Sequence, residues 1–182
     1  MTAPAFHDLT AIRPLETERL VLRVPVEADF EDHAAYATSE RARFTGGPSD
    51  RVQAWRGFIA AIGHWTIRGY GFWQVVERAT GRNLGKVGPI FPDGWPEPEL
   101  AWHLYEGAEG RGYATEAARA ARADAATRLG LGPLVSLIHP DNAPSRAVAE
   151  RLGCTLERVG ELLGQPAEFW RHPAPVATGD PA

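Results

Sequence analysis

The chain has little of several residue types and patterns, and each shortage excludes a class of protein. Its 182 residues contain one cysteine, Cys154, so no disulfide forms within the chain and a reducing cytoplasm is expected. No uninterrupted apolar run approaches the roughly 18 residues that a membrane-spanning helix requires. The first residues lack a basic segment followed by an apolar core, which argues against a secretory signal.

Basic residues are not in excess either. The formal net charge is −4, which argues against nucleic acid as a main partner because phosphate backbones require a basic face. The same charge suits a cationic substrate such as an amine. With 44% apolar and 23% charged residues, the composition is that of an ordinary globular protein. We expect an N-terminal arm over residues 1–14, a single domain over 15–173 and a flexible tail over 174–182; no metal site is predicted.

What is present is an alternation of strand and helix patterns. Strands are predicted over residues 19–24, 72–77, 84–90, 99–105, 134–138, 154–163 and 168–171. Helices are predicted over 27–38, 49–69 (with Ser49 as N-cap and Trp55, Phe58, Ile59 and Ile62 at helical spacing), 113–129 and 142–153. Turn residues at 80–81 and 92–96 join the three middle strands, which indicates an antiparallel meander.

The chain is organised around the stretch 105–116, where a strand ends in glycines and restarts as a helix. Such a junction leaves the first N–H groups of the helix without backbone partners, all pointing one way. Those amides and the helix dipole form a seat for phosphate. Gly110 and Gly112 lack the Cβ atoms that would hold a ligand away from the backbone.

Taken alone, two glycines at this spacing are a weak signal, and three explanations compete. A dinucleotide-binding loop requires glycine or alanine where Thr115 stands, and an acidic residue about 20 positions later, where the chain is apolar. A nucleoside-triphosphate loop requires Gly-Lys-Ser or Gly-Lys-Thr, which is missing. The third explanation is a tight turn that binds no ligand.

The order of elements and the segment Glu109 to Ala114 resemble the GNAT superfamily of acyl-CoA-dependent N-acyltransferases. The family signature is Gln or Arg, two variable residues, Gly, one variable residue, then Gly or Ala. Residues 111–114, Arg-Gly-Tyr-Ala, fit it, whereas Glu109 departs from it and must turn to solvent. The resemblance implies a mixed α/β fold with a largely antiparallel central sheet flanked by helices.

Three further segments resemble the RimJ/RimL-like branch of that family. The Asn-x-x-Ser…Leu-Gly segment lies at residues 142–153, Gly-Tyr-Ala-Thr-Glu-Ala at 112–117, and Leu-Glu-Thr-Glu-Arg-Leu at 15–20. The resemblance covers nearly the whole chain, from about Leu15 to Arg171. It does not specify the acceptor.

The resemblance also implies acetyl-CoA as co-substrate and a set of residues that bind it. Backbone amides over 111–115 carry the pyrophosphate, contributed by Arg111, Gly112, Tyr113, Ala114 and Thr115. Asn142 bonds the pantetheine arm or only caps its helix; either role explains an asparagine there. The strand before the loop parts from its neighbour at a bulge, and a free N–H near His103 or Leu104 faces the thioester oxygen.

For catalysis, Glu99 matches a position where some family members place the general base that deprotonates the amine. Its ordinary alternative is an exposed carboxylate at a strand end; Glu97, His103 and His139 are further candidates for the base. Many members use a tyrosine to protonate the departing thiolate, but Ala149 stands there. Ser145 is the RimL-like substitute, and its alternative role is hydrogen bonding at the helix start.

Five aromatic residues are candidates for pocket walls, of which Trp95 is the best because it lies in a turn before the active strand; the others are Trp65, Tyr70, Trp73 and Trp102. Cys154 is interpreted as a core residue.

The predicted function is the transfer of an acetyl group from acetyl-CoA to a primary amine. The amine belongs to a protein N-terminus, a lysine or a small molecule, and the enzyme is a monomer or homodimer. The alternatives are a non-catalytic CoA-binding sensor and, less favoured, a dinucleotide-dependent enzyme.

Overall fold

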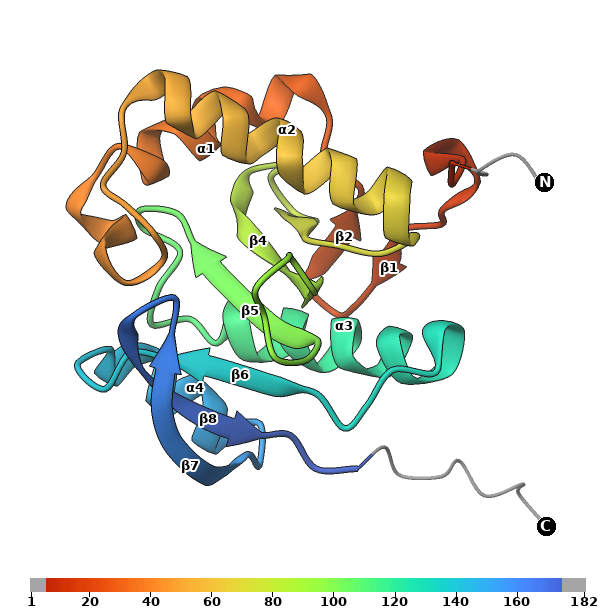
Figure 1. Ribbon diagram of the computed structural model, residues 1–182. Helices are drawn as coiled ribbons and strands as arrows, with labels where there is room; N and C mark the ends of the chain where they lie inside the picture. The colour runs from red at the N-terminus through yellow and green to blue at the C-terminus, as the bar shows by residue number, and fades with distance from the viewer. Residues whose placement is uncertain (1–5, 175–182) are drawn as a thin grey trace, which may run out of the picture.

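The computed structural model of the chain describes residues 6–174 and contains one sheet of eight strands (Figure 1). The strand order is β1-β2-β3-β4-β5-β6-β8-β7, and neighbouring strands are antiparallel except for β5 and β6. This confirms the predicted mixed α/β fold with a largely antiparallel sheet. The strands are β1 (Leu15–Glu16), β2 (Leu20–Arg23), β3 (Trp73–Glu77), β4 (Asn83–Ile90), β5 (Glu99–Leu104), β6 (Val135–Ile138), β7 (Thr155–Leu162) and β8 (Gln165–Arg171).

Helices cover both faces of this sheet. On one side lie α1 and α2, and on the other lie α3 and α4, so the sheet is the middle layer of three (Figure 1). The helices are α1 (Phe30–Ala37), α2 (Arg51–Arg68), α3 (Tyr113–Leu129) and α4 (Ala143–Arg151), with short 3-10 helices η1 (Leu9–Ala11), η2 (Glu27–Asp29) and η3 (Glu40–Phe44).

The main core lies between the sheet and α3. The residues of α3 that face the sheet are small and fully buried, namely Ala117, Ala118, Ala121 and Ala125. Because alanine side chains are short, the helix axis approaches the sheet closely and packs against Leu84, Val87 and Leu100. Helix α3 is thereby held against β4 and β5.

Helix α2 begins one residue later than predicted, and the stripe that it buries overlaps only in part with the predicted one. Asp50, not Ser49, is its N-cap: the Asp50 carboxylate accepts from the N–H of Gln53 at 2.8 Å. Trp55 and Ile59 stay 38% and 48% exposed. The helix packs through Ala54, Phe58 and Trp65, a stripe that helical spacing alone does not separate from its neighbour.

Part of the predicted arm is described and lies against α2. The N–H of His7 donates to the carbonyl oxygen of Thr66, and Asp8 caps η1. The predicted tail falls almost entirely on residues 175–182, which lie outside the described residues. Within residues 6–174, no helix is both long and apolar enough to cross a membrane.

The parallel pair β5–β6 is joined in register at one position, where Glu99 faces Val135. Beyond that pair the two strands separate, so the following residues of β5 have no partner strand on the β6 side (Figure 1). The pairing of β4 with β5 runs from Glu99 to Leu104 without a register shift. The bulge predicted at His103 and Leu104 is therefore wrong; the strands part because β6 diverges.

Candidate active site

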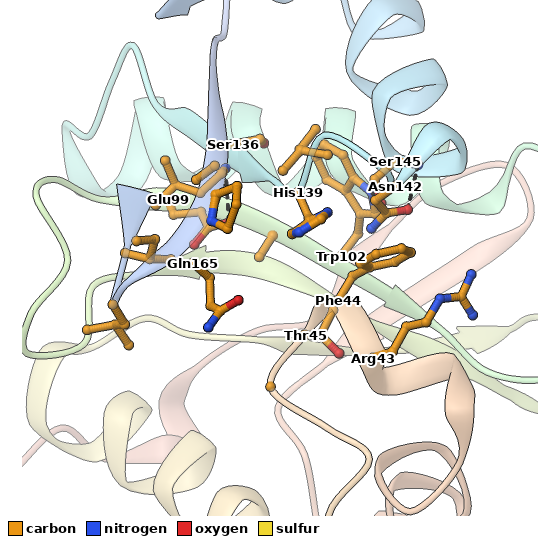
Figure 2. Close-up of a pocket in the computed structure, with 18 of the residues that line it drawn as sticks. Arg43, Phe44, Thr45, Glu99, Trp102, Ser136, His139, Asn142, Ser145 and Gln165 are labelled. Atoms are coloured by element: carbon orange, nitrogen blue, oxygen red, sulfur yellow. Dashed lines mark hydrogen bonds between the residues drawn. The ribbon is translucent and has the colours of Figure 1, made fainter. Parts of the chain in front are cut away.

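A continuous groove runs along the open edge of β5. It consists of two cavities of about 610 and about 650 Å³ that meet at shared lining residues. One cavity ends at Glu99 and the other at the start of α3. Figure 2 shows the residues of the first cavity, with the shared residues Arg43, Phe44, Thr45, Trp102, Asn142 and Ser145 gathered at one end and Glu99 at the other.

The second cavity reaches the glycine loop and the first turn of α3. Gly112 has a φ of 80° and is the N-cap of α3, with no side-chain capping bond among the described residues. The first helical N–H to find a backbone acceptor belongs to Glu116, which donates to the carbonyl of Gly112 at 3.0 Å. The N–H groups of residues 113–115 therefore lack helical partners, and these residues line the cavity. This arrangement fits a pyrophosphate.

Glu109, the departure from the family signature, pairs with Arg41 of η3. The sequence predicts only that this carboxylate must turn to solvent, and its side chain is 43% exposed. Arg41 compensates its charge next to the loop. An anionic ligand therefore meets a neutral pair at this position.

A cluster of hydrogen bonds connects residues 17–19, near the N-terminus, to the glycine loop and the start of α3. The carboxylate of Glu116 accepts from Thr17 Oγ1 at 2.6 Å, from the Arg19 backbone N–H at 3.0 Å and from Arg19 Nε at 2.7 Å. Arg19 Nη1 also donates to the carbonyl of Arg111 at 2.9 Å. These contacts join the segments 15–20 and 112–117 in the folded protein.

Replacing Arg19 tests this support. Arg19→Met is expected to raise the KM for acetyl-CoA about fivefold with little change in kcat, because the loop loses a charge-assisted bond while the N–H groups of residues 113–115 are retained. Arg51→Met is the control, since Arg51 makes a similar but exposed pair with Glu31. Steady-state kinetics of both variants measure this effect. If the KM of Arg19→Met for acetyl-CoA equals that of Arg51→Met, the contacts of Arg19 are dispensable.

The ladder of β5 identifies which of its amides face the gap. The N–H of Tyr105 donates to the carbonyl of Leu84, and hydrogen-bonded pairs alternate along antiparallel strands. The N–H of His103 therefore belongs to the bond with Lys86 of β4. The N–H groups of Trp102 and Leu104 point toward the gap. Of the two residues predicted to supply a free donor, Leu104 has the suitable orientation.

Glu99 lies at the closed end of the groove and is 6% exposed. Its Oε2 accepts from Trp95 Nε1 at 2.6 Å, and its Oε1 accepts from the N–H of Leu137 at 3.2 Å. Burial raises the pKa of Glu99 to about 7, and the two donors oppose that rise. The carboxyl group is thus not the exposed strand-end residue of the alternative reading. A carboxyl group whose pKa lies near 7 suits general-base catalysis near neutral pH.

Ser145 and Asn142 lie where the two cavities meet. Trp102 Nε1 donates to Ser145 Oγ at 3.3 Å, which leaves the hydroxyl hydrogen of Ser145 for another acceptor. Asn142 caps α4 as predicted: its Oδ1 accepts from the N–H of Ser145 at 3.3 Å. Because capping uses only the oxygen, the amide nitrogen of Asn142 remains a donor for a ligand in the groove.

The other candidate bases are less suitable. Glu97 is engaged by Arg171, with both carboxylate oxygens within 2.8 Å of the guanidinium nitrogens. His103 packs between the rings of Tyr36 and Phe72, and burial, with Lys86 nearby, lowers its pKa well below the ordinary value. His139 stacks on Phe44 at a ring distance of 5.1 Å and lines the first cavity, so it remains the nearest alternative.

The predicted aromatic residues divide between groove and core. Trp95 and Trp102 line the first cavity, whereas Trp65 and Trp73 are fully buried in the main core. Cys154 is buried, and burial raises its pKa to about 11, in keeping with a core residue. Phe44 and Ser136 were not predicted, although both line the groove. No motif marks them; only the loop after α1 and the parting of β6 bring them there.

Comparison with known proteins shows which family the chain is similar to. A family model described as "Acetyltransferase (GNAT) domain" matches residues 19–155. An acetyltransferase from Agrobacterium tumefaciens is 40% identical with a TM-score of 0.83, covering 89% of this chain and 95% of its own. A GnaT-family acetyltransferase from Bordetella pertussis is 28% identical with a TM-score of 0.76, covering 89% and 100%. The RimL ribosomal α-N-protein acetyltransferase in complex with coenzyme A is 18% identical, with a TM-score of 0.71 and coverage of 88% and 96%; it shows a shared fold.

Proposed function

The chain belongs to the GNAT acetyltransferase family, whose acyl donor is acetyl-CoA, and on this premise we propose that it transfers the acetyl group directly to a primary amine. One observation carries the proposal: the groove joins the uncapped start of α3 to a buried carboxylate whose pKa is close to 7. A site that only bound CoA would not require such a carboxylate at its far end.

The residues along the groove then take distinct roles. Acetyl-CoA supplies an activated thioester when bound, held by the amides of residues 113–115 and by Asn142. Glu99 removes a proton from the ammonium form of the acceptor, since only the neutral amine attacks. The N–H of Leu104 in the gap polarises the acyl oxygen. Ser145 relays a proton to the departing sulfur: its hydroxyl gives its hydrogen to the sulfur and takes one from the amine nitrogen, while Trp102 Nε1 donates a hydrogen bond to its oxygen.

The walls of the acceptor cavity favour a monoamine with an apolar body. Among the described residues that line it, Glu99 is the one carboxylate, and aromatic and aliphatic side chains supply much of the remaining surface. A polyamine or an aminoglycoside carries several charges that would find no counter-ions there. The net charge of −4 is thus less informative about the acceptor than the local charge.

The proposal is tested by incubating the protein with acetyl-CoA and a panel of amines while measuring thiol release. We expect turnover with apolar monoamines or peptides with free N-termini, and at least about tenfold lower kcat/KM with spermine or kanamycin. CoA binding without thiol release from any amine would instead establish the alternative, a CoA-binding sensor on the same fold.

Two finer assignments accompany the proposal. The segments at residues 15–20, 112–117 and 142–153 support a place in the RimJ/RimL-like branch, and RimL and other ribosomal-protein acetyltransferases share the fold. A cytoplasmic location agrees with the free, buried Cys154.

A further inference from the structure

The point where β5 and β6 separate has an unusual hydrogen-bond arrangement. The N–H of Val135 donates to the carbonyl of Pro98 at 3.4 Å. Bonds of a parallel ladder recur every two residues, so the next one would join the N–H of Leu137 to the carbonyl of Leu100. The strands pair in register only at the preceding position, and this next bond is replaced.

Two side chains replace the missing bond: one accepts from its N–H donor and the other donates to its carbonyl acceptor. The N–H of Leu137 donates to Glu99 Oε1 at 3.2 Å, and the carbonyl of Leu100 accepts from Ser136 Oγ at 2.5 Å. Neither backbone group is left unsatisfied in the protein interior, where an unpaired group costs roughly 1–3 kcal/mol. The separation of the strands is therefore stable without any ligand between them.

His172 fixes the direction in which the Ser136 hydroxyl points. His172 Nε2 lies 2.9 Å from Ser136 Oγ, and Nδ1 lies 3.3 Å from Arg122 Nη1. A guanidinium only donates, and the thiol of Cys154, whose Sγ also lies 3.3 Å from Nδ1, can donate its S–H, so Nδ1 accepts and Nε2 carries the proton, which it donates to Ser136. Ser136 then has its own hydrogen for Leu100. Burial lowers the pKa of His172 to about 3, so this arrangement persists at neutral pH.

From this geometry we propose that Ser136 is a positioning residue: its bond to Leu100 keeps β5 and β6 apart at the first missing rung and leaves the N–H of Leu137 to Glu99. The inference rests on the proposed function, in which the gap receives the acyl donor and Glu99 acts as base. According to this inference, the hydroxyl group of Ser136 maintains both the gap between β5 and β6 and the hydrogen bond from Leu137 to Glu99. Ser136 lines the groove at the end where Glu99 lies (Figure 2).

Loss of the hydroxyl has two consequences that a merely structural serine would not have. The free carbonyl of Leu100 is then available to the N–H of Leu137, so the ladder gains one rung and the gap shortens. Glu99 loses a donor that stabilises its ionised form, and its pKa rises. The other ionisable side chains on the described walls of the cavity are Arg43 and His139, and the N–H of Trp95 is unaffected.

The experiment compares Ser136→Ala with wild type and with Thr127→Ala, which removes a comparable bond from a hydroxyl to the carbonyl of Ala123, two residues that do not line the groove. For Ser136→Ala we expect an about tenfold weaker CoA affinity by calorimetry, and an acidic limb of the kcat/KM profile displaced upward by about half a pH unit. A crystal structure should show Leu137 bonded to Leu100. Ser136→Thr, which keeps the hydroxyl, should restore both values.

An Ser136→Ala protein with wild-type CoA affinity and pH profile would overturn the proposal, whatever its melting temperature. If Ser136→Ala does not fold, His172→Phe removes the donor behind Ser136 and should change both values in the same direction but less; unchanged values would again overturn it. If no amine is acetylated by wild type, CoA affinity and the Leu137–Leu100 separation still give the answer, so failure of the proposed function is distinguishable.

Discussion

Glu99→Gln is expected to lower kcat at pH 7 by about 100- to 1,000-fold, with little change in the KM for acetyl-CoA. The amide keeps an oxygen for the N–H of Leu137 but cannot remove a proton from the acceptor. In the wild type, Glu99 Oε2 accepts a hydrogen bond from Trp95 Nε1; in Glu99→Gln an NH2 group faces this N–H and cannot accept it. Because the bond to Leu137 is kept, we expect the fall in kcat to come mainly from the loss of proton transfer at the acceptor end of the groove.

The pH dependence separates this role from a structural one. The base must be ionised, so wild-type kcat/KM should rise with pH through a limb near pH 7, where the pKa of Glu99 lies. In Glu99→Gln that limb disappears, and activity recovers in part at high pH, where the amine loses its proton unaided. Glu97→Gln is the control, because Glu97 pairs with Arg171. An unchanged pH profile in Glu99→Gln would remove Glu99 from the mechanism.

Ala114→Pro is expected to weaken CoA binding by about 10- to 100-fold, the second largest effect. Residue 114 is the second position of α3, where proline removes no helical bond but removes one of the N–H groups that we propose to bind the diphosphate. The chain itself carries Pro144 at the second position of α4. The kcat at saturating acetyl-CoA should change less, because the acceptor end of the groove is untouched.

Calorimetric titration with CoA measures this effect, and Val52→Pro supplies the matched control. Val52 is the second residue of α2, is 60% exposed and lies away from the groove, so its variant should bind CoA normally. Circular dichroism checks that Ala114→Pro, whose site is buried, is folded. A folded Ala114→Pro with wild-type affinity would show that the amides of α3 do not hold the diphosphate.

The sequence predicts local features of this protein well. The bounds of α3 agree with the prediction, because glycines at 110, 112 and 130 interrupt an otherwise uniform helix-forming run. The Asn142 cap and the strands β3 to β5 also follow from neighbours within a few residues. The stripe that α2 buries was predicted only in part: Phe58 is buried, but Ala54 is buried too, against Phe30 and Ala34 of α1, and Trp65 is buried in the main core.

By itself, then, the sequence determined the mixed α/β fold and the location of the glycine loop and the start of α3, because these depend on short-range patterns of turns, caps and apolar spacing, and the resemblance of residues 109–114 to a known signature indicated the family. Only the tertiary structure decided that Glu99 is buried with its pKa near 7, that Arg41 neutralises Glu109, and that Ser136 occupies the missing rung. These properties arise from desolvation and from contacts between residues up to about 70 positions apart, which no local pattern encodes.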